Sequence, residues 1–88
     1  MEKKVTYEIE NGKKVKVETF TNGSVYKYDT NGRLVHYKSK IIEYWYEYDT
    51  NGNCIHYKES DGYEKWYEYD VYGNMVHTRD TNGIEEWF

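Results

Sequence analysis

Two neighbouring stretches of the chain, WYEYDTNGNCIHYKESDGYE (45–64) and WYEYDVYGNMVHTRDTNGIE (66–85), are near copies of one another. A partial earlier copy reads VYKYDTNGRLVHYKSK (25–40). Each full copy holds two glycine-marked turns and two short segments that alternate in polarity. Repetition on this scale is typical of stacked supersecondary units rather than of an enzyme built around one enclosed pocket.

Glycine marks the turns between these segments. Five of the seven glycines follow Asn, one follows Asp61 and one follows Tyr72. Asn-Gly and Asp-Gly supply the positive φ angles that tight hairpin turns require. In the D-x-x-G turns we expect Asp to bond backbone amides and Gly to close the turn with a bulge. These turns are Asp29–Gly32, Asp49–Gly52, Asp70–Gly73 and Asp80–Gly83.

The segments between the turns are rich in Tyr, Val, Ile and Trp and predict nine strands. We expect them at about 3–9, 13–20, 24–29, 33–39, 41–49, 53–59, 63–70, 74–79 and 84–88. The predicted fold is all-β, an antiparallel meander made of hairpin repeats. No segment has helical periodicity. The prediction is a single domain over 1–88, in which 1–22 is a degenerate N-terminal copy and 23–88 holds the clearer repeats.

The composition restricts both the core and the partners. The chain has no alanine and one leucine, but 12 Tyr and 3 Trp, so aromatic rings at half-buried positions must supply most of the core. This aromatic content argues against disorder, although the mean hydropathy is -1.12. The net charge of -4 disfavours sequence-independent binding to nucleic acid. An acidic surface promotes solubility, and the alternative is an acidic decoy for a nucleic-acid-binding groove.

Cys54 is the only cysteine, so no intrachain disulfide can form. It takes the position of Leu34 and Met75 in the other copies, which favours a packing role over a reactive thiol. No apolar run is long enough to span a membrane, and none resembles a secretory signal peptide. A cytoplasmic location is therefore expected.

Equivalent side chains should recur on every second strand, roughly 9–10 Å apart. One face is predicted to carry a row made of Tyr26, Tyr46, Tyr67 and Phe88. The other face is predicted to carry Trp45, Trp66 and Trp87. Rigid Tyr and Trp rings make good binding surface at low entropic cost. The candidate binding residues are therefore Trp45, Trp66, Trp87, Tyr46, Tyr67 and Phe88, with a purely structural role for these rings as the alternative.

Three histidines, His36, His56 and His77, occupy one repeated position. A spacing of about 10 Å prevents them from converging at about 2 Å on one zinc ion, so a structural row and no metal site is predicted. The neighbouring charges are interpreted as cross-strand Glu–Lys pairs. The D-x-x-G turns lack the oxygen ligands of a calcium loop. No catalytic set or phosphate-binding glycine loop is found, so neither catalytic residues nor a cofactor is predicted.

The phrases YKYDTNGRLVHY (26–37), YEYDTNGNCIHY (46–57) and YEYDVYGNMVH (67–77) resemble the YD repeat of Rhs-type and teneurin-like proteins. That pattern is roughly G-x-x-x-x-Y-x-Y-D-x-x-G-R/N-L. Arg33 carries the usual Arg after the turn glycine, whereas Asn53 and Asn74 replace it in the other copies. The resemblance implies β-sheet strips that are structural or binding elements, with catalysis residing elsewhere. A short version of such a strip would be an adaptor, an immunity-type binder or an inhibitor.

Two main functions follow from these observations. The first is a non-enzymatic protein-binding module, such as a small inhibitor or immunity-type protein, that uses its aromatic face or a sheet edge. The alternative is a carbohydrate-binding module that uses the tryptophan row. We expect a protein partner or a second copy of the chain, because a meander leaves two edge strands. The last strand, which ends on Trp87 and Phe88, is the expected contact.

Overall fold

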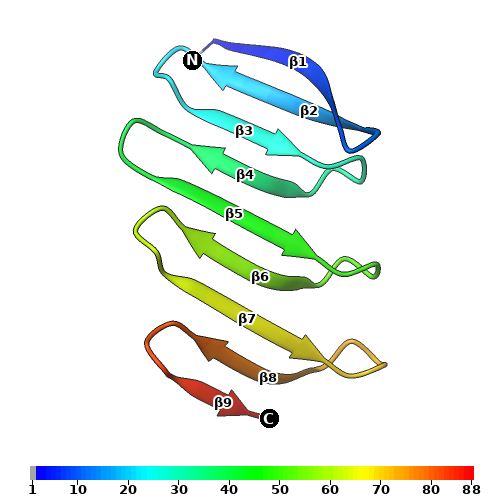
Figure 1. Cartoon of the computed structure of the whole chain (residues 1–88). Coiled ribbons are helices and arrows are strands. Elements are labelled where there is room, and N and C mark those ends of the chain that lie inside the picture. Colours follow the sequence, from blue (N-terminus) through cyan, green and yellow to red (C-terminus); the bar gives the residue numbers. More distant parts are fainter. Residues whose placement is uncertain (1) are drawn as a thin grey trace. The chain divides into compact units, whose positions relative to one another are not determined.

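The computed structural model describes residues 2–88, and these residues form nine β-strands and no helix (Figure 1). The strands are β1 (Lys3–Glu10), β2 (Lys13–Phe20), β3 (Val25–Tyr28), β4 (Leu34–Lys38), β5 (Glu43–Tyr48), β6 (Cys54–Glu59), β7 (Glu64–Tyr69), β8 (Met75–Asp80) and β9 (Glu85–Trp87). Consecutive strands pair in antiparallel fashion, which confirms the predicted all-β meander. Over the same residues, the structure contains no helix with the length and apolar character to cross a membrane.

Contacts between residues divide the chain into two units, Met1–Trp45 and Tyr46–Phe88. Unit 1 contains β1 to β4 and the first half of β5. Its longest ladder joins β1 to β2, from Lys3 opposite Phe20 to Glu10 opposite Lys13. Unit 2 contains the second half of β5 and β6 to β9. Within it, β7 pairs with β6 on one side and with β8 on the other.

The D-x-x-G turns have the predicted construction. At Asp49, one carboxylate oxygen accepts hydrogen bonds from the backbone amides of Asn51 and Asn53, both at 2.9 Å. Gly52 follows with a φ of 89° and donates its amide to the Asp49 carbonyl. The hydrogen bond from the Asn53 amide, together with the neighbouring donors, holds the pKa of Asp49 below its usual value. The turns at Asp29, Asp70 and Asp80 repeat this pattern.

A bulge accompanies the turn in both units. The register shifts between Lys27 and Tyr28 where β3 pairs with β4, and between Glu68 and Tyr69 where β7 pairs with β8. These are equivalent positions of the repeat, one residue before the turn Asp. The two units therefore share a backbone irregularity as well as a turn, as the sequence repeat predicts.

Tyrosine rings pack side by side on one face of each unit, which we call the tyrosine face. In unit 1 the ring centroids of Tyr26 and Tyr37 lie 4.7 Å apart, and those of Tyr37 and Tyr44 lie 5.7 Å apart. In unit 2 the Tyr46 and Tyr57 centroids lie 5.2 Å apart. Most of these residues are half-buried, as predicted. Tyr37 of β4 and Tyr57 of β6 pack against Tyr26 and Tyr46 of the predicted row, whereas Thr78 of β8 lies opposite Tyr67.

Aliphatic burial is concentrated on β2. Of the hydrophobic residues in 2–88, only Val15 and Val17 are buried, with 8% and 5% of their surface exposed. Their face also carries Lys27 of β3, whose ammonium lies 3.4 Å from a Glu8 oxygen and 3.3 Å from a Glu10 oxygen on β1. To reach those carboxylates the Lys27 stem must cross β2. Its methylene groups therefore help to cover the two valines.

Candidate functional site

Each histidine of the repeat stacks on a tryptophan of the following strand. The pairs are His36–Trp45, His56–Trp66 and His77–Trp87, with ring centroids 5.4, 5.3 and 3.8 Å apart. The rings of each pair are within 22° of parallel, because the two residues lie directly opposite each other in the strand register. The predicted tryptophan residues are thus partners of the histidines rather than an uncovered row.

In unit 2, glutamates bind both nitrogens of the stacked imidazole. His56 Nδ1 lies 2.9 Å from a Glu47 oxygen on β5, and Nε2 lies 2.8 Å from a Glu64 oxygen on β7. A neutral imidazole has one N–H, and a carboxylate can only accept, so both hydrogen bonds form together when the ring is an imidazolium. Burial of the ring opposes that charge, but the two glutamates outweigh burial and raise the pKa of His56 above its usual value.

His77 has the same arrangement one repeat later. Its Nδ1 lies 2.7 Å from a Glu68 oxygen on β7, and its Nε2 lies 2.9 Å from a Glu85 oxygen on β9. The hydrogen bond that the ring donates to Glu68, followed by the one that it donates to Glu85, raises the pKa of His77 despite the burial of the ring. We call each of these Glu–His–Glu sets with its stacked Trp a histidine clamp.

The first copy differs at a single position of this set. His36 Nε2 lies 2.9 Å from a Glu43 oxygen, but the position that holds Glu47 or Glu68 in unit 2 is Lys27. Sequence reasoning interpreted these glutamates as partners of lysines and so missed the clamps. A signal was present in the spacing, because a Glu occurs nine residues before and eight residues after each histidine of unit 2.

The clamps place their carboxylates on opposite sides of each ring. Such an arrangement holds a proton-bearing ring and does not direct several ligands at one point. No group of three or more His, Cys, Asp or Glu side chains within residues 2–88 is arranged to hold a metal ion.

Large apolar side chains are exposed at the C-terminal strand. Trp87 and Phe88 are 74% and 70% exposed, and the preceding Ile84 is 57% exposed. Among the described residues of unit 2, β9 pairs on one side only, with β8. Of the six candidate binding residues, Trp87 and Phe88 are therefore the two that the structure brings together on an accessible edge.

The other four candidate residues are more covered. Trp66 lies between its His56 partner and Arg79, whose guanidinium carbon is 4.9 Å from the ring centroid. Trp45 stacks on its histidine, and Tyr46 packs against its neighbour on the tyrosine face. Burial raises the pKa of the Tyr67 hydroxyl. These four side chains therefore have less accessible surface than Trp87 and Phe88.

One turn exposes apolar side chains that sequence reasoning did not single out. Val71 and Tyr72 are 90% and 86% exposed in the turn between β7 and β8. The other three D-x-x-G turns carry Thr and Asn at these two positions. This departure from the repeat is the sequence signal that could have identified the turn.

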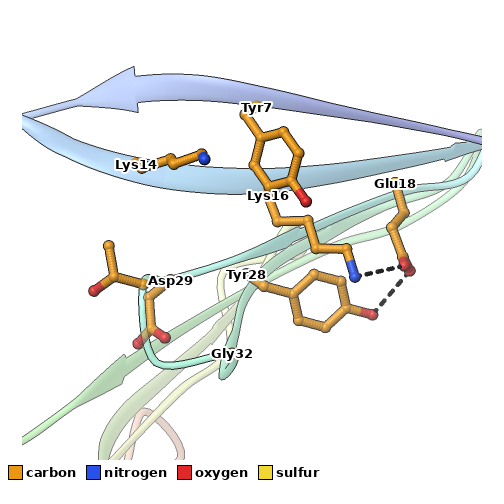
Figure 2. Close-up of a pocket in the computed structure, with 8 residues that line it drawn as sticks. Tyr7, Lys14, Lys16, Glu18, Tyr28, Asp29 and Gly32 are labelled. Atoms are coloured by element: carbon orange, nitrogen blue, oxygen red, sulfur yellow. Dashed lines mark hydrogen bonds and ion pairs between the residues drawn. The ribbon is translucent and has the colours of Figure 1, made fainter.

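Unit 1 contains an open groove of about 630 Å³ on its tyrosine face (Figure 2). Its lining consists of Tyr7, Lys14, Lys16, Glu18, Tyr28, Asp29, Thr30 and Gly32. Glu18 is buried. Its carboxylate lies 2.9 Å from the Lys3 ammonium and 3.4 Å from the Lys16 ammonium, and it accepts a hydrogen bond from the Tyr28 hydroxyl at 3.3 Å. The lysine hydrogen bonds lower the pKa of Glu18. Two lysines face two carboxylates, so the lining is electrically balanced and selects neither an anion nor a cation.

A comparison with protein families supports the repeat assignment. The family model described as RHS Repeat matches residues 46–85. This confirms the resemblance to YD repeats over the segment that runs from β5 to β9. No curated protein matches the chain.

Proposed function

We propose that this chain is a non-enzymatic protein-binding module whose contact is the open edge of β9. The observation that carries the proposal is the exposure of Trp87, at 74%, on a strand that pairs with β8 alone among the described residues of unit 2, and of the adjoining Phe88, at 70%. An edge strand offers unpaired backbone donors and acceptors to an incoming strand. Exposed aromatic side chains beside such an edge supply the contact area that dominates binding energy.

The chemistry of the edge defines the partner. An extended segment of a protein would pair with the β9 backbone and place apolar side chains against Trp87. The neighbouring Glu86 is exposed, which favours Lys or Arg in that segment. Such a module would act as an inhibitor or immunity-type protein by occupying the strand-binding surface of its partner. A second copy of the chain is the homotypic version of the same contact.

The carbohydrate alternative has less support. A sugar platform needs exposed ring faces, but Trp45 stacks on His36 and Trp66 lies between His56 and Arg79. Trp87 alone among the three tryptophans is largely exposed.

The edge is tested by placing a photo-crosslinking amino acid at Glu86 and, as a control, at Thr6 of β1. A partner that crosslinks at position 86 is then purified, and its affinity is measured for Trp87→Ser and Phe88→Ser. We expect each to weaken binding by roughly tenfold or more, as central aromatic contacts do. Tyr72→Ser is the control, because Tyr72 is also a largely exposed aromatic residue but lies away from the edge. This variant should change the affinity less than twofold.

The homotypic version is tested by light scattering at micromolar concentration, with and without residues 84–88. Dimers that persist after the deletion would contradict a β9 contact. A partner whose affinity depends on Tyr72 and not on Trp87 would place binding on the turn instead.

A further inference from the structure

Strand β9 depends heavily on one histidine of the neighbouring strand. The strand has three residues, which lie opposite His77, Thr78 and Arg79 of β8. His77 contacts two of the three, stacking on Trp87 at 3.8 Å and bonding Glu85 at 2.9 Å. The backbone adds a hydrogen bond from the Phe88 amide to the Val76 carbonyl at 3.0 Å. A change at His77 therefore affects a large share of the side-chain interactions that dock β9 on β8.

The clamp needs one more proton than a neutral histidine and two carboxylates possess. With that proton, Nδ1–H donates to Glu68 and Nε2–H donates to Glu85. Without that proton, one ring nitrogen has no N–H, and its lone pair faces a carboxylate at hydrogen-bond distance. Glu68 and Glu85 would then share a single donor. One charge-assisted hydrogen bond becomes a repulsive contact.

We propose that β9 is a proton-controlled strand, which docks on β8 while the His77 clamp holds its extra proton and loosens when that proton leaves. The inference concerns the docking of β9 within this chain and does not depend on a partner. It makes the exposed C-terminal edge sensitive to pH near neutrality, where histidine titrates.

The charges around His77 set the sign of the effect. Glu68 faces it from β7 and Glu85 from β9, while Arg79 is the other charged residue of β8 on this face. The glutamates raise the pKa of His77 above its unfolded value of about 6.5, so docking is strongest below that pH and weakens as pH rises through the folded pKa.

Glu85→Gln is the most informative variant. A glutamine amide accepts from Nε2–H when the ring is charged, and it donates to the Nε2 lone pair when the ring is neutral. In the Glu85→Gln variant, the docking of β9 on β8 should therefore change little with pH. Glu86→Gln is the matched control, because it removes the same charge from the same strand, while Glu86 lies opposite Thr78 and is exposed.

The readout is hydrogen exchange of the Phe88 amide by NMR at about pH 6 and pH 8.5, corrected for intrinsic exchange. Protection in the wild type and in Glu86→Gln should fall by about tenfold, the factor expected for one lost charge-assisted hydrogen bond. In Glu85→Gln it should change less than twofold and exceed the wild-type value at the higher pH.

Equal pH dependence in all three proteins, or none in the wild type, would overturn the proposal. So would a His77 ring that, in nitrogen-detected NMR of the intact chain, titrates below about 6.5, the ordinary histidine value. His77→Gln offers a second route, since its Phe88 protection should also lose its dependence on pH.

Discussion

The two units use one position of the same repeat in opposite ways. In unit 1 the position holds Lys27, which reaches across β2 to Glu8 and Glu10 of β1. In unit 2 it holds Glu47 and Glu68, which bond the histidines of the adjacent strand. The backbone around the position is shared, including the bulge that follows it in β3 and β7. A single charge reversal therefore changes whether the side chain bonds a histidine of the adjacent strand or carboxylates one strand further away.

This difference shows how a repeat can diverge without altering its sheet. Lysine is long enough to cross one strand and to cover Val15 and Val17 on the way. Glutamate is shorter and bonds the residue directly beside it. Unit 1 thus gains a small aliphatic core under a lysine–glutamate ion pair, whereas unit 2 gains polar clamps that depend on a histidine proton.

The first prediction tests the shared backbone, and it should have the largest effect. Gly32 in unit 1 and Gly52 in unit 2 have φ angles of 81° and 89°. A β-branched residue resists this region, so Gly32→Val and Gly52→Val should each lower the free energy of unfolding by about 2–3 kcal/mol. Urea titration measures both. Asn should cost less than half as much, since Asn11 already adopts a φ of 53° in this chain. A large cost at one glycine and none at the other would show that the turns differ.

The second prediction converts unit 1 to the pattern of unit 2. Lys27→Glu removes both ion pairs, places a negative charge opposite Val17, and uncovers valine surface. We expect a loss of about 1–2 kcal/mol in unfolding free energy, above the usual value of one surface pair. Lys27→Met keeps the stem without the charge and should cost clearly less. Equal costs for Glu and Met would show that neither the cover over the valines nor the added negative charge matters, because both variants remove the ion pairs.

The third prediction concerns the interior clamp at His56. Because its pKa is raised in the folded state, its contribution to stability is complete below the unfolded value of about 6.5 and is lost as pH rises through the folded pKa. The wild-type chain should therefore melt at a lower temperature at pH 8.5 than at pH 6. His56→Gln and Glu47→Gln should flatten this dependence in calorimetry, and Glu86→Gln should preserve it. A wild-type melting temperature that rises over this interval would contradict the clamp.

The sequence predicted the parts of the structure that follow from local chemistry. Asn-Gly and D-x-x-G segments specify turns by themselves, so the nine strands and the hydrogen bonds that the turn amides donate to Asp49 were predictable. The alternation also predicted half-buried tyrosines. The ends of β5 and β9 were less certain, because Ile42 and Phe88 suit a strand but lie outside the observed bounds.

The clamps were not predicted because they depend on register and on ring orientation. Glu64 neighbours Lys58 in the register, so Glu–Lys pairing was a reasonable interpretation. The structure instead directs the Glu64 carboxylate at His56. The sequence shows that Val71 and Tyr72 replace the Thr and Asn of the other turns. It does not show that both side chains are exposed, which the structure does.

The fourth prediction is the smallest and compares one tyrosine position in the two units. Tyr69 donates its hydroxyl to the Cys54 carbonyl at 2.7 Å, and burial raises its pKa. Its counterpart Tyr28 donates at 3.3 Å to Glu18, which lysines already contact. Tyr69→Phe leaves a strand carbonyl without this donor and should cost about 1 kcal/mol, whereas Tyr28→Phe should cost about half of that or less. Both substitutions keep the ring, so paired urea titrations isolate the hydroxyl. A larger loss at Tyr28 would mean that the long bond to Glu18, and hence the buried charge of unit 1, matters more to the sheet than a short bond to its backbone.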